Sequence, residues 1–375
     1  MLFLGFILCG KVVLGGLDLN CNSNVVHYWG QNSYGGSHLS DKNLWEKDLS
    51  FYCDQSDVDV INLSFLNIFN AGYGKLPEIN FSNHCADFFN GTSLHTCPKI
   101  GHDIAYCQKK GKTVLLSLGG AVANTGFPSS SAASGFATTL WDLFMEGKHT
   151  YRPFGKAIID GIDLDLEGGS QQHFDVFLSA LQKKFGNSGR KYFVTAAPQC
   201  EFPDRNLQQI MEKGYMDAIF IQFYNNFCGV QNYGNQWAWN WPQWDAWATT
   251  RSFNKKAKLF VGVPAARSAA GSGYVTIDAL ETILKDIRSK YTSFGGVMLW
   301  DSSQNEHNRV GGATYSERIK KFLKAGTSCG HVPPTTSYTY AATTSQKPTF
   351  TTDLTPSSYP TSSPSNYRAP GVVSA

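Results

Sequence analysis

Charged residues are scarce in this chain. Lys, Arg, Asp and Glu make up only 16% of its 375 residues, against about a quarter in a typical globular protein. The net charge of +3 is small and no run of basic residues interleaved with aromatic ones occurs, so nucleic acid is not an expected partner. No apolar run has the length of a membrane-spanning helix. The composition therefore favours a neutral partner.

Motifs for metals and nucleotides are missing as well. The chain has no C-x-x-C pair, so a zinc site is not predicted, and we expect neither a metal nor a cofactor. No G-x-G-x-x-G follows the first strand-like run, which argues against a dinucleotide-binding open sheet.

The first sixteen residues are apolar and end in small residues. Residues 1–16 predict a secretory signal peptide, although Lys11 interrupts the run and no positive charge precedes it; a buried first strand is the alternative. Removing this segment takes away Cys9 and leaves eight cysteines, an even number that favours four disulfides in a secreted protein. Sequons at Asn80 and Asn90 predict N-glycans, whereas the sequon at Asn62 falls in a strand pattern and is expected to be silent.

Short β-rich runs alternate with helical patterns between residue 25 and about residue 325. The eight runs are 25–29, 58–65, 113–118, 159–166, 192–197, 218–224, 259–264 and 296–300. Between the fourth and fifth runs, 171–184 places its large apolar residues on one helical face. Strands that alternate with helices pair in parallel, and eight such units predict a closed (β/α)8 TIM barrel. A doubly wound open sheet is the alternative.

The composition changes abruptly after the last cysteine. Residues 329–375 are rich in Ser, Thr and Pro and contain few aliphatic residues, so they predict a disordered, O-glycosylated tail. No hydrophobic segment follows, so a GPI anchor is not predicted. The predicted organisation is a signal peptide at 1–16, a barrel domain at 17–328 and the tail at 329–375.

Four acidic residues crowd the fourth predicted strand. Asp163, Asp165 and Glu167 are two positions apart, so they project to one face, while Ile and Leu project to the other. In a barrel the acidic face points into the lumen, and Glu167 emerges at the C-terminal rim, where barrel enzymes carry their chemistry. Asp160 is out of phase, and we expect it to have a structural role.

Crowded carboxyls in a lumen cannot all ionise. At least one should stay protonated near neutral pH, and the coupling favours the outermost, Glu167, as a general acid. In two-carboxylate glycosidases the carboxyls flank the scissile bond, whereas Asp165 and Glu167 approach it from one side, which argues against Asp165 as a nucleophile. The alternatives are an acidic strand with a structural role and a divalent-metal site, although no further acid in the rim segments clearly completes such a site.

The motif D-G-I-D-L-D-L-E at 160–167 resembles the D-x-x-D-x-D-x-E signature of family 18 glycoside hydrolases, the (β/α)8 chitinases. Other stretches are similar to the plant and fungal class III, hevamine-like branch: H-Y-W-G-Q-N at 27–32, L-L-S-L-G-G at 115–120, A-A-P-Q-C at 196–200, I-Q-F-Y-N-N at 221–226 and V-M-L-W-D at 297–301. The resemblance covers residues 25 to about 325, and the tail is typical of fungal cell-wall members. It implies a secreted or cell-wall-associated endochitinase that acts on chitin or chito-oligosaccharides with retention.

The resemblance also implies roles for individual residues. Glu167 would be the general acid and then the base, Asp165 would hold the acetamido N–H of the substrate, and Asp163 would be a deeper proton-sharing partner. The nucleophile would be the substrate's own acetamido carbonyl, which removes the geometric difficulty noted above. Tyr224 would donate its hydroxyl to that carbonyl.

Further residues are candidates for binding the sugar. Trp300 would form the floor under the −1 sugar, and Gln222 should face the lumen beside Tyr224. Weaker candidates for lining the cleft are Tyr28, Gln31, Phe65, Gly120 and Asn225. Packing in the core is the alternative for each aromatic residue.

The stretch 236–247 holds five tryptophans. The spacing of Trp244 and Trp247 favours a helix packed on the barrel. Trp237, Trp239 and Trp241 precede Pro242 in a predicted rim loop and are candidates for extending the cleft.

The cysteines fit the same branch. The resemblance implies three bridges, Cys53–Cys107, Cys85–Cys97 and Cys200–Cys228. Cys21 and Cys329 remain, and we predict that they join the two ends of the barrel. We expect a monomer.

Two readings of the activity stay open. A non-catalytic chitin-binding lectin or inhibitor on the same barrel is the alternative, but such members commonly lose an acid of the motif, and here Asp163, Asp165, Glu167 and Tyr224 are all present. Activity on peptidoglycan or on N-glycan cores is also open. A cell-wall structural protein that uses the Ser/Thr-rich tail as a stalk is a third possibility, compatible with either of the first two.

Overall fold

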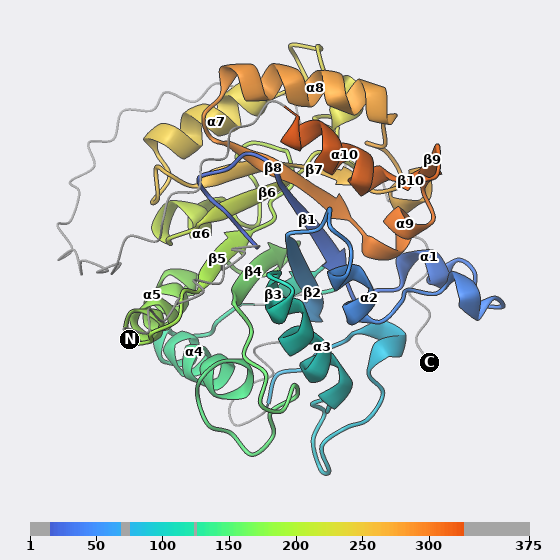
Figure 1. Ribbon diagram of the computed structural model, residues 1–375. Helices are drawn as coiled ribbons and strands as arrows, with labels where there is room; N and C mark the ends of the chain where they lie inside the picture. The colour runs from blue at the N-terminus through green and yellow to red at the C-terminus, as the bar shows by residue number, and fades with distance from the viewer. Residues whose placement is uncertain (1–15, 69–75, 124–125, 326–375) are drawn as a thin grey trace, which may run out of the picture. The chain divides into compact units, whose positions relative to one another are not determined.

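The structure is a computed structural model that describes residues 16–68, 76–123 and 126–325 (Figure 1). Residues 1–15 of the predicted signal peptide, the predicted tail and Cys329 lie outside these residues, so those predictions remain predictions. No helix in the described ranges is both long and apolar enough to cross a membrane.

Eight parallel strands close into a barrel, as the sequence predicts. Each strand pairs with the next one along the chain, and β8 pairs with β1. The strands are β1 (Asn24–Trp29), β2 (Val60–Leu66), β3 (Thr113–Gly120), β4 (Gly161–Leu166), β5 (Phe193–Ala196), β6 (Ala218–Gln222), β7 (Lys258–Pro264) and β8 (Phe294–Trp300). All eight predicted runs are strands, although β6 ends at Gln222, two residues earlier than predicted.

Helices surround this barrel (Figure 1). In the described residues they are α1 (Ser33–Gly36), α2 (Leu49–Cys53), α3 (Pro98–Lys109), α4 (Ser130–Phe144), α5 (Phe174–Gly186), α6 (Gln208–Lys213), α7 (Trp241–Thr250), α8 (Ile277–Lys290), α9 (Ser302–Glu306) and α10 (Tyr315–Lys324). A short hairpin of β9 (Arg309–Val310) and β10 (Ala313–Thr314) precedes α10. Helix α5 buries the apolar face predicted for 171–184.

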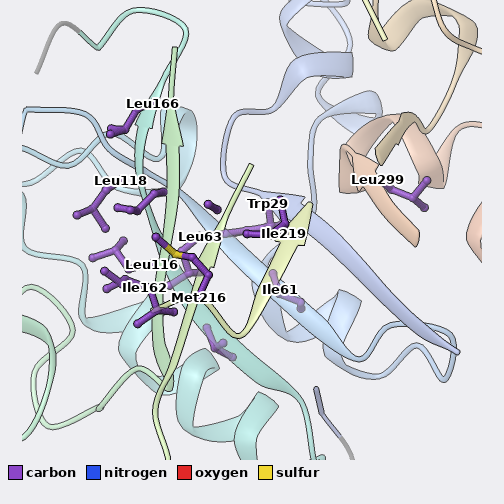
Figure 2. Close-up of a cluster of buried hydrophobic side chains, with 14 of the residues drawn as sticks. Trp29, Ile61, Leu63, Leu116, Leu118, Ile162, Leu166, Met216, Ile219 and Leu299 are labelled. Carbon is purple, nitrogen blue, oxygen red and sulfur yellow. The ribbon is translucent and has the colours of Figure 1, made fainter. Parts of the chain in front are cut away.

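The alternation of side chains along each strand separates two cores. On β4, Ile162, Leu164 and Leu166 belong to the outer core between strands and helices, part of which is drawn in Figure 2. The lumen holds a smaller apolar cluster that includes Val26, Val60, Leu115, Phe220, Phe260 and Met298. The side chains of Asp163 and Asp165 take the lumen side, because their parity is opposite to that of the outer-core residues.

The tryptophan-rich stretch divides at the start of α7. Trp244 and Trp247 are buried in that helix, as predicted. Trp241 is also buried, with its ring 6.0 Å from that of Phe294, so the prediction that it extends the cleft is wrong: it is the first helical residue and packs inward. Trp237 is 85% exposed.

The three bridges implied by the resemblance are present. They are Cys53–Cys107, Cys85–Cys97 and Cys200–Cys228. The last one joins the loops that follow β5 and β6. The Cys21–Cys329 bridge stays a prediction, because Cys329 is outside the described residues.

Candidate active site

The acidic face of β4 forms a column that runs toward the C-terminal rim. Asp163 and Asp165 are buried in the strand, and Glu167 follows its last residue and is half-buried. Asp160 lies before the strand, where its carboxylate accepts hydrogen bonds from the Val114 N–H at 2.9 Å and from Arg190 at 3.0 Å. Asp160 therefore ties neighbouring segments together at the opposite end of the barrel, in agreement with the structural role expected for it.

Asp163 is held by three hydroxyl groups from three other strands. Its carboxylate accepts hydrogen bonds from Tyr28 at 2.7 Å, Ser117 at 2.7 Å and Thr195 at 2.6 Å. Burial raises the pKa of Asp163, and the three hydroxyls lower it. The pKa of Asp163 stays raised overall, so the three hydroxyls offset only part of the cost of a negative charge at the bottom of the column.

Ser117 and Thr195 were not predicted as site residues. Both lie directly beside Asp163 in the strand register, Ser117 on β3 and Thr195 on β5. Each is a hydroxyl residue inside a strand-like run, which is a visible signal in the sequence. Selecting these two as partners of Asp163, however, requires the register of the neighbouring strands.

Asp165 and Glu167 share a buried, acidic environment. Burial raises the pKa of Asp165 well above its usual value, and the charges of Glu167 and Asp163 raise it further. Burial also raises the pKa of Glu167, against the lowering effect of Gln222. These directions agree with a proton retained among the carboxyls. The sequence favours Glu167 as its holder, and the charges of Glu167 and Asp163 on either side of Asp165 raise the pKa of Asp165 as well.

Gln222 organises the centre of the column. Its side-chain amide donates to Asp165 Oδ1 at 2.8 Å and to the Ala197 carbonyl at 3.0 Å. The predicted position of Gln222 in the lumen is therefore confirmed, and its amide fixes the orientation of the Asp165 carboxylate.

A fourth carboxylate that the sequence does not predict, Asp204, acts on the column. It is buried, and it accepts hydrogen bonds from the backbone N–H groups of Gln199 at 2.9 Å and Leu207 at 2.6 Å. Its charge raises the pKa of both Asp165 and Glu167. Asp204 lies in the loop after β5 and belongs to none of the motifs, so only tertiary structure reveals its influence.

Tyr224 lies in the loop immediately after β6 and is almost fully buried. Burial raises the pKa of its hydroxyl well above the usual value, and the charges of Asp165 and Glu167 raise it further. The hydroxyl therefore stays protonated and can donate. Gly273 makes room for this residue, because a Cβ there would lie 2.4 Å from the Tyr224 Cβ.

Three aromatic side chains make an apolar surface beside the column. The Tyr28 ring lies 5.7 Å from that of Trp300 and 6.3 Å from that of Phe65, and the Phe65 and Trp300 rings are stacked. Gly120 has φ of +88°, and a Cβ there would lie 2.8 Å from the Phe65 ring. These four residues, predicted separately, are thus brought together by β1, β2, β3 and β8.

The two remaining candidates hold backbone segments. The Gln31 side chain donates to the carbonyls of Ser64 at 2.7 Å and Asn80 at 3.1 Å. The Asn225 side chain accepts from the backbone N–H of Gly271 at 2.8 Å. Both amides are therefore engaged in fixing loops at the rim. Within residues 16–68, 76–123 and 126–325, no group of three or more His, Cys, Asp and Glu side chains could hold a metal ion.

Curated relatives of this chain include fungal chitinases. It is 43% identical over 310 residues to "Chitinase 2" of Rhizopus oligosporus, and the aligned segment covers 82% of this chain and 54% of that protein. It is 42% identical over 308 residues to "Endochitinase" of Saccharomyces cerevisiae, and the aligned segment covers 82% of this chain and 51% of that protein. The chain thus spans about half the length of these relatives.

Solved structures with a similar fold include an enzyme and an inhibitor. The ICChI chitinase from Ipomoea carnea is 32% identical, with a TM-score of 0.64 over 80% of this chain and 99% of that one. The xylanase and alpha-amylase inhibitor XAIP-II from Scadoxus multiflorus is 30% identical, with a TM-score of 0.64 over 79% of this chain and 97% of that one. The family model "Glycosyl hydrolases family 18" matches residues 24–353. With the acidic column on β4 and the closed barrel around it, this match shows that the chain belongs to glycosyl hydrolase family 18.

Proposed function

We propose that this protein is a secreted endochitinase that hydrolyses β-1,4-linked N-acetylglucosamine polymers with retention, by a substrate-assisted mechanism. The observation that carries the proposal is the complete column of Asp163, Asp165 and Glu167, with Tyr224 beside it. The apolar surface of Tyr28, Phe65 and Trp300 supports it, because aromatic faces suit the C–H faces of a sugar ring.

In the first step, Glu167 donates its proton to the glycosidic oxygen. The acetamido carbonyl oxygen of the −1 sugar attacks C1, the C1–O bond to the leaving sugar breaks, and an oxazolinium forms. Asp165 accepts a hydrogen bond from the acetamido N–H, and Tyr224 donates one to the acetamido oxygen. When substrate binds, its acetamido N–H stabilises the ionised form of Asp165. The proton shared by the two carboxyls is then held by Glu167.

In the second step, Glu167 acts as a base. It takes a proton from a water molecule, and the resulting hydroxyl attacks C1 on the face that the leaving sugar vacated. The C1–O bond of the oxazolinium breaks and the acetamido group is restored. Two inversions at C1 give net retention.

The proposal is tested with 4-methylumbelliferyl chitotrioside. The wild type should release the fluorophore, and Glu167→Gln should lower kcat by roughly 10²–10⁴-fold, which is the usual contribution of a positioned acid–base group. Thermal unfolding at an unchanged Tm would show that the variant still folds. A wild type inactive on every N-acetylglucosamine polymer would rule out the enzyme and favour the lectin or inhibitor alternative, which the similarity to XAIP-II motivates.

Secretion is part of the same proposal. Three disulfides in the described residues support it, because such bridges persist in oxidising compartments. Association with a cell wall and a monomeric state are proposed as well. Fractionation of an expressing culture into medium, wall and cytosol, with size-exclusion chromatography of the secreted material, tests all three; protein confined to the cytosol would contradict secretion.

A further inference from the structure

The asparagines of the three N-glycosylation sequons lie in different environments. Asn62 is on β2 and is fully buried, so a glycan attached to it is incompatible with the folded barrel, because glycans are bulky and belong at surfaces. Asn80 and Asn90 are exposed and lie in the segment between β2 and α3. The folded protein can therefore carry a glycan at two of the three positions.

Asn80 lies directly beside a residue of the proposed sugar-binding surface. Asn80 and Phe65 exchange backbone hydrogen bonds, and each N–H donates to the carbonyl of the other residue at 2.9 Å. The Cα atoms of residues paired in this way are about 5.5 Å apart. The Gln31 side chain adds a second connection, because it donates to the Asn80 carbonyl at 3.1 Å. Asn80 is therefore at the edge of the apolar surface formed by Tyr28, Phe65 and Trp300.

The neighbours of Asn80 determine the direction in which its side chain projects. Ile79 and Phe81 are both buried in the outer core between strands and helices. Successive side chains of an extended segment alternate between its two faces, so the Asn80 side chain projects away from that core. A group attached to it is presented to solvent on the side away from the helices.

The local geometry of this sequon is compatible with a modified amide. The Ser82 N–H donates to Asn80 Oδ1 at 2.8 Å, which closes an Asx turn across the sequon. This hydrogen bond uses the oxygen of the Asn80 amide, whereas an N-glycan is attached to its nitrogen. The turn can therefore persist when the glycan is present.

Asn90 is in a different position. It lies in the hairpin that is closed by the bridge between Phe88 and His95. The neighbouring Phe89 ring packs 5.2 Å from that of Tyr151, in the segment that leads into β4. A glycan on Asn90 would stand on this hairpin, so Asn90 supplies an internal comparison for Asn80.

We propose that Asn80 carries an N-glycan whose sugars stand at the edge of the substrate-binding surface and keep an insoluble polymer away from it. The inference rests on the proposed secretion and the proposed chitinase function, and it deepens them. A glycan is bulky, and it is much larger than the separation of about 5.5 Å between the Asn80 and Phe65 backbones. It obstructs a rigid polymer surface more than a single soluble chain, because the single chain can adjust its path.

The modification is a transfer from a lipid-linked diphosphate oligosaccharide in the secretory pathway. A bond forms between Asn80 Nδ2 and C1 of the first sugar, and the C1–O bond to the diphosphate breaks. The lipid diphosphate leaves with the bonding electron pair, and one amide proton is released.

The first part of the test reads the occupancy of each sequon. The full chain is produced in a secreting host that N-glycosylates, and it is treated with peptide-N-glycosidase in heavy-oxygen water, which labels every asparagine that carried a glycan. Peptide mass spectrometry should show the label at Asn80 and Asn90 but not at Asn62.

The second part compares variants on insoluble chitin and on 4-methylumbelliferyl chitotrioside. Ser82→Ala removes the sequon and keeps the backbone N–H that donates to Asn80. Asn80→Asp is an independent variant, because an Asp oxygen can accept the same hydrogen bond. In both, the rate on insoluble chitin relative to that on the chitotrioside should rise roughly threefold, which corresponds to about 0.65 kcal/mol. Asn90→Gln is the matched control and should leave this ratio unchanged.

The outcomes separate this inference from the proposed function. An unoccupied Asn80 in the secreted protein overturns it, and so does an occupied Asn80 whose removal leaves the ratio unchanged. A ratio that rises equally in Asn90→Gln also overturns it, because the effect would not depend on the position beside Phe65. If the wild type hydrolyses neither substrate, the proposed function fails, while the peptide masses still decide whether Asn80 is glycosylated. A rise confined to Ser82→Ala and Asn80→Asp, with unaltered activity on the chitotrioside, supports the inference.

Discussion

The Tyr28 hydroxyl donates a 2.7 Å hydrogen bond to Asp163 across the lumen of the barrel. Tyr28 lies on β1 and Asp163 on β4, 135 residues further along the chain. The ring of the same tyrosine packs against Trp300 in the apolar surface formed by Tyr28, Phe65 and Trp300. One side chain therefore joins the proposed sugar-binding surface to the charge at the base of the acidic column.

The first prediction concerns this hydrogen bond. Tyr28→Phe keeps the ring but removes one of three donors to Asp163, so the pKa of Asp163 should rise. If the proposed activity requires Asp163 to be ionised, that activity is lost as the pH falls through its pKa, so the acidic limb of the kcat profile should move to higher pH. A hydrogen bond to a charged group contributes about 1.5–3 kcal/mol, so kcat should fall roughly tenfold or more.

Tyr106→Phe is the matched control, because it removes a 2.7 Å hydrogen bond to Asp54 at the surface. Unaltered kcat and pH profile for Tyr28→Phe would contradict the role.

The second prediction concerns Asp204. Its charge raises the pKa of Glu167 and Asp165, so Asp204→Asn should lower both values. In the proposed mechanism Glu167 must carry a proton to act as the acid, so activity should be lost as the pH rises above its pKa. The basic limb of the kcat profile should therefore move to lower pH. Asp217→Asn changes a buried carboxyl at the other end of the barrel and should leave the profile in place. A basic limb that moves upward, or equally in both variants, would refute the electrostatic argument.

The third prediction concerns stability and pH. Burial raises the pKa of Asp217 from 3.8 to about 6. The folded protein then binds more protons than the unfolded chain in this window, so the contribution of Asp217 to stability is greatest below pH 4 and is lost as the pH rises through about 6. The loss is at most about 3 kcal/mol.

Asp217→Asn should remove this dependence, because the Asn amide does not titrate. Asn also keeps an acceptor for the Val194 N–H that now donates to Asp217. The measurement is the free energy of unfolding by denaturant at pH 4, 5, 6 and 7 for both proteins. Parallel curves for wild type and variant would show that Asp217 does not titrate in this window.

The fourth prediction concerns Gly120. Gly120→Ala puts a Cβ 2.8 Å from the Phe65 ring at a residue with φ of +88°, so it should displace that ring from the floor. Strained backbone alone costs about 1–3 kcal/mol. Gly312→Ala is a close control, because Gly312 has φ of +84° and open space around its Cβ position. Both variants should be destabilised, but only Gly120→Ala should also raise KM for chito-oligosaccharides. Equal KM values would remove Phe65 from the sugar-binding surface.

Much of the fold could be predicted from the sequence, because its signals are local. Alternating apolar runs and helical patterns gave eight strands in the right order, and the period of two on β4 placed Asp163 and Asp165 in the lumen. The boundaries were less certain: Tyr224 belongs to a loop because β6 ends at Gln222. Helix α7 begins at Trp241, which turned a predicted rim residue into a core one.

The sequence by itself determined which residues could carry the chemistry: a strand with three acids in phase, a glutamate before two glycines, and aromatic residues at strand ends. Only the tertiary structure decided how their charges are held. Ser117, Thr195 and Tyr28 reach Asp163 from three strands through the register of a closed sheet, and Asp204 acts on the column from a loop. Register and through-space electrostatics depend on residues far apart in the chain, and no local pattern encodes them.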